Sequence, residues 1–182
     1  MEKYYRTKHI FLAIGICIAI SSPFLLVFVP QTIADIIYYT EGIGQIFVPK
    51  ENYVVYGVGF LFLFLAAMLL SLLDIKKVSI ILSIACVCLS AIPFFIASQS
   101  YKSISEESLS YRALFSKREY SYSWDEIERV IHYKAEDGDF PEYEFLFKDG
   151  NHVMFKANRY FQEVIPLLYY KLEEINVRIE RQ

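Results

Sequence analysis

Few side chains in this 182-residue sequence are arranged as catalytic or metal-binding groups usually are. Five carboxylates occur between residues 136 and 144, but their spacing differs from that of a calcium-binding loop. His132 and His152 have no accompanying cysteine or second nearby histidine, so they do not match a zinc pattern. No Gly-x-Ser-x-Gly turn, phosphate-binding loop or His-Glu-x-x-His motif is present. We therefore predict a non-enzymatic protein with no catalytic residue, no cofactor and no bound metal.

Positive charge is the second kind of candidate chemistry. Lys117 and Arg118 are adjacent in a predicted turn, and they are the candidate surface-binding residues, for a lipid surface or for a protein. Glu119 follows them at once, and the whole chain has a net charge of −3. The basic face that binds nucleic acid is absent, so nucleic acid is excluded as a partner.

Three strongly apolar runs, at residues 10–29, 53–73 and 78–97, fill the first half of the chain. A helix of about twenty residues spans the bilayer core of roughly 30 Å, and each run has that length. The first run could also be a secretory signal, but it is longer than a signal's apolar region, which favours an uncleaved anchor. No Asp, Glu, Lys, Arg or His lies within any run, which argues against a proton or ion pathway. The sequence thus predicts a multi-pass protein of the cell membrane.

The third run carries a row of small residues at spacings of four, three and four: Ser79, Ser83, Cys86 and Ser90. This spacing places them on one face of a helix, where small side chains let helix backbones approach closely. We predict that the row packs against the other two helices or forms the interface of a homo-oligomer.

The flanking charges predict the orientation of the spans, because Lys and Arg are retained on the cytoplasmic side. Basic residues precede the first run and also occupy the short link at residues 74–77, whereas the loop at residues 30–52 is mainly acidic. The N-terminus is therefore expected in the cytoplasm and the C-terminal domain outside, although basic residues after the third run oppose this assignment. Residues 31–49 are expected to include a short helix lying at the outer interface.

Beyond residue 98 the pattern changes to short segments of alternating polarity, at residues 108–115, 119–124, 127–133, 143–147 and 152–155. Each resembles a strand with one buried face. The Asp149–Gly150 pair is a strong hairpin signal, and Ser123 or Asp125 is expected to cap a single turn before the third segment. Trp124 is expected to lie in the core.

A helix is predicted after Asn158, a residue suited to cap its N-terminus. Its apolar positions recur at intervals of three and four and form one stripe: Phe161, Ile165, Leu168, Leu172, Ile175 and Ile179. The C-terminal half is thus expected to contain five or six antiparallel strands closed by one helix, an α+β arrangement. The expected division is a three-helix membrane region at residues 1–100 and a soluble domain at residues 101–182.

Three short stretches carry a resemblance to a known family: Ile-Ser-Glu-Glu-Ser-Leu at 104–109, Tyr-Ser-Trp-Asp-Glu-Ile at 122–127 and Phe-Lys-Asp-Gly at 147–150. With the order of elements, they make residues 103–181 similar to bacterial PH-like domains appended to membrane segments. The resemblance implies a half-open antiparallel β-barrel or sandwich plugged by the final helix. It implies function only weakly, because fold does not fix function.

Two functional hypotheses remain open. In the first, the PH-like domain binds a protein, peptide or lipid surface next to the bilayer, while the helices anchor it and provide an oligomerisation surface. In the second, the chain is a membrane enzyme or small-molecule carrier with a site around residues 101–112. A deep polar cavity there would favour the second hypothesis.

Overall fold

The computed structural model describes residues 7–40, 42–135 and 139–181. The chain divides into two compact units, each made of two stretches of sequence. The first unit comprises Met1–Ile33 and Val48–Ser100, and the second comprises Ala34–Phe47 and Tyr101–Gln182. The second unit therefore includes fourteen residues from the loop between the first two apolar runs, which had been expected to belong to the membrane region.

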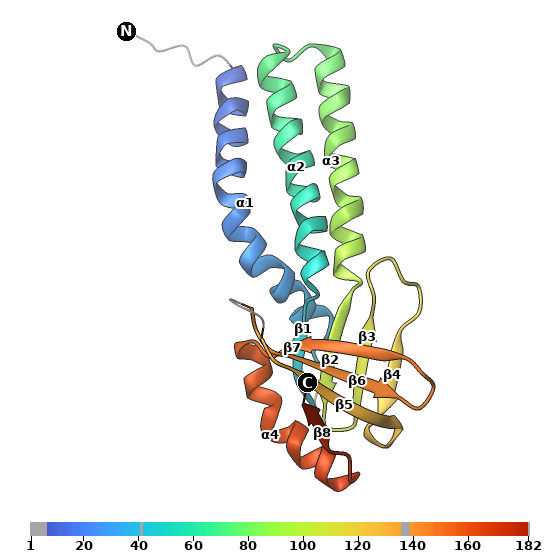
Figure 1. Cartoon of the computed structure of the whole chain (residues 1–182). Coiled ribbons are helices and arrows are strands. Elements are labelled where there is room, and N and C mark those ends of the chain that lie inside the picture. Colours follow the sequence, from blue (N-terminus) through green and yellow to red (C-terminus); the bar gives the residue numbers. More distant parts are fainter. Residues whose placement is uncertain (1–6, 41, 136–138, 182) are drawn as a thin grey trace. The chain divides into compact units, whose positions relative to one another are not determined.

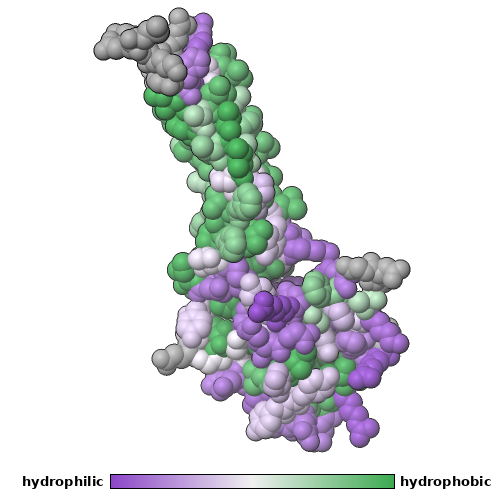
Figure 2. All heavy atoms as spheres, turned by 90° about the vertical axis from the view of Figure 1, so that its left-hand side faces the viewer, coloured by the Kyte–Doolittle hydropathy of each residue, from purple (hydrophilic) through white to green (hydrophobic). Residues whose placement is uncertain are grey.

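The first unit is helical, and its helices are α1 (Thr7–Tyr38), α2 (Lys50–Leu72) and α3 (Lys77–Ser98) (Figure 1). All three are long and apolar enough to cross a membrane, as the sequence predicted. Large side chains on them are exposed, such as Phe24 at 68% and Phe95 at 67%. Figure 2 shows this hydrophobic surface over the helices and a mostly hydrophilic surface over the second unit.

The short helix expected near residues 33–38 is not separate, because α1 continues without a break to Tyr38, and part of it lies in each unit. Pro30 lies inside α1 and cannot donate a backbone hydrogen bond. The Thr32 hydroxyl donates to the carbonyl oxygen of Phe28 at 2.9 Å. Apolar helices tolerate such a proline.

The second unit contains two four-stranded sheets. The first sheet has the order β1-β2-β3-β4 and the second the order β7-β6-β5-β8. The strands are β1 (Ile43–Phe47), β2 (Tyr101–Ser105), β3 (Ser108–Arg112), β4 (Tyr120–Ser123), β5 (Ile127–Tyr133), β6 (Glu142–Phe147), β7 (His152–Lys156) and β8 (Ile179–Arg181). In the described residues these sheets do not close into a barrel.

Strand β1 was not predicted, and it comes from the loop that precedes α2. It pairs antiparallel with β2, so that Ile46 lies opposite Ser103 and Phe47 opposite Lys102. Helices α2 and α3 lie between these two strands in the chain. Paired strands lie on the same side of any membrane, so a membrane that α2 crossed in one direction would have to be crossed by α3 in the other.

The predicted antiparallel pairing of both hairpins is confirmed, and β6 and β7 are joined at Gly150, whose φ is +87°. The strand predicted at residues 108–115 ends earlier, at Arg112, so residues 113–119, which include Lys117 and Arg118, connect β3 to β4. The one-turn helix η1 (Trp124–Glu126) has Ser123 and Glu126 as a reciprocal capping pair. Trp124 is 5% exposed, and its indole N–H donates to the Ser105 carbonyl oxygen at 3.2 Å.

Helix α4 (Arg159–Glu174) begins as predicted, with the Asn158 side chain accepting a hydrogen bond from the Phe161 N–H at 3.1 Å. It ends earlier than predicted, because Asn176 adopts the left-handed conformation at φ +57°. Ile179 consequently lies in β8 rather than on the helix. Strand β8 pairs parallel with β5, so the expectation of only antiparallel strands was wrong.

A single apolar core joins both sheets to α4. Leu109 of the first sheet, Phe145 of the second and Phe161 of the helix are all fully buried in it. The apolar stripe predicted for the helix is thus confirmed as far as Leu172.

Candidate functional site

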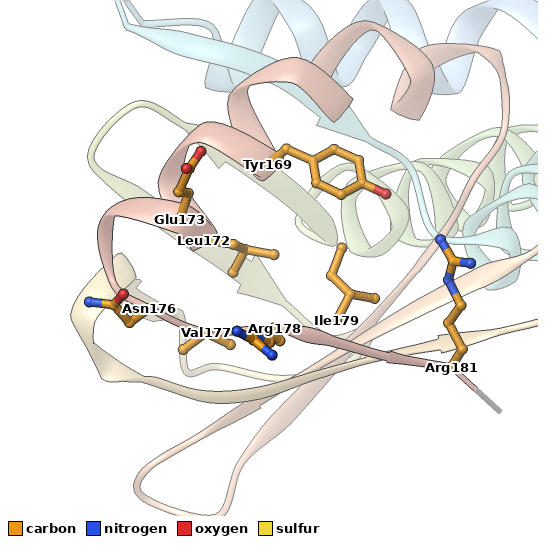
Figure 3. A pocket seen from close by; sticks show the side chains of 8 residues that line it. All are labelled: Tyr169, Leu172, Glu173, Asn176, Val177, Arg178, Ile179 and Arg181. Atoms are coloured by element: carbon orange, nitrogen blue, oxygen red, sulfur yellow. The ribbon is translucent and has the colours of Figure 1, made fainter.

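A groove of about 510 Å³ lies between the end of α4 and strand β8 (Figure 3). Eight residues line it: Tyr169, Leu172, Glu173, Asn176, Val177, Arg178, Ile179 and Arg181. Figure 3 shows Tyr169 and Leu172 coming from the helix, and Ile179 and Arg181 standing on the helix side of the strand. The groove is therefore walled by one helix and one strand of the second unit.

The groove exists because the chain reverses direction directly after α4. The N–H of Val177 donates to the Leu172 carbonyl oxygen at 3.0 Å, and that of Asn176 donates to Glu173 at 3.1 Å. These bonds close the helix end around the left-handed Asn176, a conformation that Asn tolerates better than most residues. Residues 177–181 then return beside the helix as β8.

The groove combines an apolar floor with charged side chains. Leu172 is buried, while Val177 and Ile179 are partly buried against the core. Arg178 and Arg181 are exposed, and Glu173 is the one lining carboxylate. The lining side chains thus carry one net positive charge.

Successive residues of β8 point to opposite faces, which separates the charges of this strand. Glu180 faces away from Ile179 and Arg181 and forms an ion pair with Arg129 at 3.4 Å. Its negative charge is therefore directed away from the groove. Of the charged side chains of β8, Arg181 is therefore the one that faces the helix.

Tyr143 of β6 lies behind the groove and is hydrogen-bonded to Tyr169. Burial and the neighbouring Tyr169 raise the pKa of the Tyr143 hydroxyl, while Arg181 acts in the opposite direction. The Tyr143 hydroxyl is therefore neutral at physiological pH. It can position the Tyr169 ring at the groove wall but supplies no charge.

A second hollow, of about 340 Å³, lies where the sequence suggested a site at residues 101–112. Its lining includes Tyr38, Tyr101, Glu119 and four serines of β2 and β3. The Tyr38 and Tyr101 rings stack at 3.8 Å between centroids, and the Tyr101 hydroxyl donates to Glu119 Oε1. Burial, and to a smaller extent this hydrogen bond, raises the pKa of Tyr101 far above its ordinary value.

The polar groups of this second hollow bond mainly to one another. The Ser103 hydroxyl donates to the Ser110 carbonyl oxygen at 3.4 Å, and that of Ser105 donates to the Ser108 carbonyl oxygen at 2.8 Å. Glu119 already accepts the Tyr101 hydroxyl. The arrangement is a satisfied polar network, so we take the groove beside α4 as the stronger candidate.

The predicted surface-binding residues lie elsewhere in the second unit. Lys117 and Arg118 are exposed in the turn between β3 and β4, whereas the groove belongs to α4 and the second sheet. Exposure is compatible with a surface-binding role, which remains a prediction.

The small residues of α3 are placed as a packing face would require. Ser79, Ser83 and Ser90 are buried and Cys86 is partly buried. The Ser83 hydroxyl donates to the Ala66 carbonyl oxygen of α2 at 2.9 Å. This hydrogen bond joins α2 to α3, while a role in a homo-oligomer remains a prediction.

Sequence reasoning missed Asn52, which fastens the start of α2 to the end of α3. Its side chain is 1% exposed, and Nδ2 donates to the carbonyl oxygens of Ala97 at 2.9 Å and Ser100 at 2.8 Å. Sequence reasoning also missed Arg178 and Arg181, because the apolar spacing predicted a helix that continued to Ile179. The residue that could have revealed the end of the helix in the sequence is Asn176, since Asn is common where helices end.

The carboxylates considered for calcium lie partly outside the described residues. Of those described, Asp139 and Glu142 both contact Lys156 Nζ, and Glu142 does so at 3.7 Å. His132 lies against the Tyr143 ring, with centroids 4.7 Å apart. Among the described residues no three His, Cys, Asp or Glu side chains are grouped as metal ligands.

Comparison with known proteins yields little. No protein-family model and no curated protein matches the chain. One partly similar solved structure is described as "Structure of the Spt16D Pob3N heterodimer", with 13% sequence identity and a TM-score of 0.31. The match covers 46% of this chain and 45% of that one, which is less than half the length of each. Similarity at this level carries no argument about fold or function.

Proposed function

We propose that this protein is a membrane-anchored recognition protein whose second unit binds an extended peptide segment of a partner protein between α4 and β8. The observation that carries the proposal is an edge strand that borders a half-apolar, positively charged groove. The three helices serve as the anchor. The activity proposed is binding rather than catalysis.

The position of β8 in its sheet supports recognition through the backbone. Strand β8 stands last in the sheet order and pairs only with β5 among the described strands. An edge strand offers a row of backbone N–H and C=O groups that an extended peptide can extend as a further strand. Such a peptide would lie about 4.8 Å from β8 in the plane of the sheet, at the border of the groove.

The side chains of the groove define the peptide chemistry. Alternate residues of an added strand would point toward α4, where Leu172 and the Tyr169 ring offer apolar contact. Arg178 and Arg181 would pair with carboxylates, and guanidinium groups are suited to bidentate contacts with them. The proposed ligand is therefore a strand that places an apolar side chain next to Asp or Glu.

We also propose that the second unit is a PH-like domain. The support is its arrangement of two sheets on one core, with α4 contributing Phe161, Val164 and Leu168 to that core. The resemblance of residues 103–181 noted in the sequence agrees with this arrangement. Strand β1 then adds residues 43–47 to the domain from before the α2–α3 pair.

The proposed orientation places the N-terminal side of α1 in the cytoplasm and the second unit outside. Lys8 forms an ion pair with Asp74 at 2.8 Å, so the start of α1 and the α2–α3 link lie on one side. Lys76 and Lys77 add positive charge on that side, which the charge rule assigns to the cytoplasm. The partner would then be extracytoplasmic. Protease added to intact cells should remove a tag placed after Gln182, whereas protection of the tag would reverse the orientation.

Site-specific photocrosslinking tests the groove directly. A benzophenone amino acid would replace Tyr169, which lines the groove and is 49% exposed, or Tyr160, which is 48% exposed at the other end of α4. The two positions are matched in residue type, helix and exposure. A peptide displayed as an extended segment with alternating apolar and acidic residues serves as the probe.

We expect the probe to crosslink at position 169 and not at position 160. Arg178→Glu should abolish the crosslink, because it reverses the charge beside the groove without touching the apolar floor. A crosslink of equal yield at both positions, or one that survives Arg178→Glu, would reject the proposed site.

A further inference from the structure

The turn at residues 113–119, between β3 and β4, presents an aromatic side chain to solvent. Phe115 is 74% exposed and has a φ of +64°. A bulky residue rarely adopts this left-handed conformation, and such strain tends to occur where a side chain must be presented. The turn therefore holds Phe115 outward at a conformational cost.

Hydrogen bonds within the turn fix this presentation. The N–H of Ser116 donates to the Ala113 carbonyl oxygen at 3.0 Å, and Arg112 Nε donates to the Ser116 carbonyl oxygen at 3.1 Å. The Arg118 N–H donates to the Ser116 hydroxyl oxygen at 3.1 Å. Phe115 thus projects from a braced turn.

The turn lies at the end of the first sheet where the chain arrives from a membrane span. Strand β2 begins at Tyr101, and only Gln99 and Ser100 separate it from the end of α3. Tyr101 pairs with Arg112, the last residue of β3. The turn at residues 113–119 therefore lies at the end of the sheet where β2 begins, just after α3 in the chain. The β2–β3 turn at residues 106–107 lies at the opposite end of the sheet.

The charges of the turn suit a lipid headgroup layer. Lys117 and Arg118 are exposed beside Phe115, while the carboxylate of Glu119 accepts the Tyr101 hydroxyl. Aromatic rings and basic side chains are the residues that proteins place at bilayer interfaces. Each basic residue close to an anionic surface strengthens the contact about fivefold.

From these observations we infer that the 113–119 turn docks on the bilayer that the helices span, with Phe115 in the headgroup layer and Lys117 and Arg118 on anionic headgroups. This contact is distinct from peptide binding in the groove, and it holds the second unit at the membrane surface by a second attachment. The loss of either contact leaves the other in place.

Fluorescence in reconstituted vesicles tests the docking. The full chain, with its three cysteines replaced, carries one environment-sensitive nitrobenzoxadiazole label on Phe115→Cys or on Glu107→Cys. The two positions are exposed turns at opposite ends of the same sheet. The vesicles contain phosphatidylcholine alone or mixed with phosphatidylglycerol, and a lipid carries a quencher near the headgroup.

We expect emission from position 115 to shift to shorter wavelength and to be quenched by the lipid, whereas the label at position 107 should show neither effect. Quenching at position 115 should increase with phosphatidylglycerol and fall when Lys117→Glu and Arg118→Glu are combined. Equal quenching at both positions would overturn the inference. So would a wavelength shift at position 115 without lipid quenching, which would indicate a protein contact.

Discussion

The two units of this chain are held together by different physical means. In the helices, only 6% to 22% of the most apolar window of each span is buried within the protein. In the second unit, apolar side chains of both sheets and α4 converge on a continuous core. Apolar composition therefore has opposite meanings in the two units: in the helices the apolar side chains face outward, as in membrane spans, and in the sheets they face inward.

The contacts between α2 and α3 combine close approach at a glycine, a hydrogen bond and aromatic rings, such as Phe60 and Phe94, which meet edge to face at 5.1 Å between centroids. The ring of Phe94 on α3 packs against Gly59 of α2, and Ser83 donates to the α2 backbone. Lipid is as apolar as a helix surface, so close approach and hydrogen bonds must hold such helices together. In the second unit, aromatic rings such as Phe145 and Phe155 also meet edge to face, but there within a core shared by both sheets and α4.

The largest effect is expected in the second unit. Phe145→Ala should lower its free energy of unfolding by about 3–5 kcal/mol, because Phe145 is fully buried and its removal leaves a cavity. Trp124, the single tryptophan, reports on this unit during denaturation of the detergent-solubilised chain. Phe140→Ala, at a side chain that is 54% exposed, is the matched control, and its effect should stay within about 0.5 kcal/mol. An equal effect at both positions would contradict a core-dominated unit.

In the helices the largest effect should come from a polar side chain. Asn52→Ala leaves the carbonyl oxygens of Ala97 and Ser100 without the donor that they now share. We expect a loss of about 2–4 kcal/mol, measured by the loss of helical circular dichroism on heating. Ser98→Ala serves as the control, because its exposed hydroxyl donates to the carbonyl oxygen of Phe95 in the same helix, α3. If Asn52→Ala melts like the parent protein, the polar fastening between α2 and α3 has no energetic role.

Two glycines of α2 allow the effect of close packing on stability to be distinguished from the effect of helix propensity. A Cβ on Gly59 would approach the Phe94 ring at 2.8 Å, whereas one on Gly57 would meet its nearest neighbour, Leu26 Cδ1, at 3.8 Å. Gly59→Ala should therefore cost about 1–3 kcal/mol through overpacking. Gly57→Ala should stabilise the helix by roughly 0.5–1 kcal/mol. Melting curves of the two variants should move in opposite directions, and a shift in the same direction would argue against close packing at Gly59.

Alkaline pH should weaken the second unit. Burial and the hydrogen bond to Asp149 raise the pKa of Tyr122, and burial also raises that of Tyr101. In the unfolded chain both hydroxyls lose their protons near pH 10, while the folded unit retains them. Stability is thus fully present below about pH 10 and falls as the pH rises above it. Denaturation followed by Trp124 should show this decline, and Tyr122→Phe should make it shallower.

How far the sequence predicted the fold depended on whether the signal was local. The spans, the capped helix start at Asn158 and the Asp149–Gly150 turn were predicted because composition or a few adjacent residues determine them. Strand β1 was missed because its partner β2 lies beyond two entire helices in the chain. No periodicity within residues 43–47 reveals such a distant partner.

The candidate groove was missed for a related reason. Ile175 and Ile179 continue the apolar spacing of α4, so the pattern alone favoured a longer helix. The left-handed Asn176 instead reverses the chain and creates both β8 and the groove. By contrast, Lys117 and Arg118 were found because exposed charge in a turn is visible in the sequence itself.

The central structural claim is that the second unit is assembled from two stretches separated by the α2–α3 pair. It is tested most directly by a disulfide between β1 and β2, using Ile46→Cys with Ser103→Cys in a chain without other cysteines. Residues paired directly across antiparallel strands have Cα atoms about 4.5–5.5 Å apart, within the range for a disulfide. The control joins Ile46→Cys to Ser110→Cys, which lies opposite Ser103 one strand further away, at about 10 Å.

A protease site placed in the α2–α3 link provides the measurement. After oxidation in membranes and cleavage, we predict that the two fragments of the 46–103 variant migrate together on a non-reducing gel and separate when reduced, while those of the 46–110 control separate in both cases. Separation of the 46–103 fragments without reductant would contradict the claim that β1 belongs to the second unit.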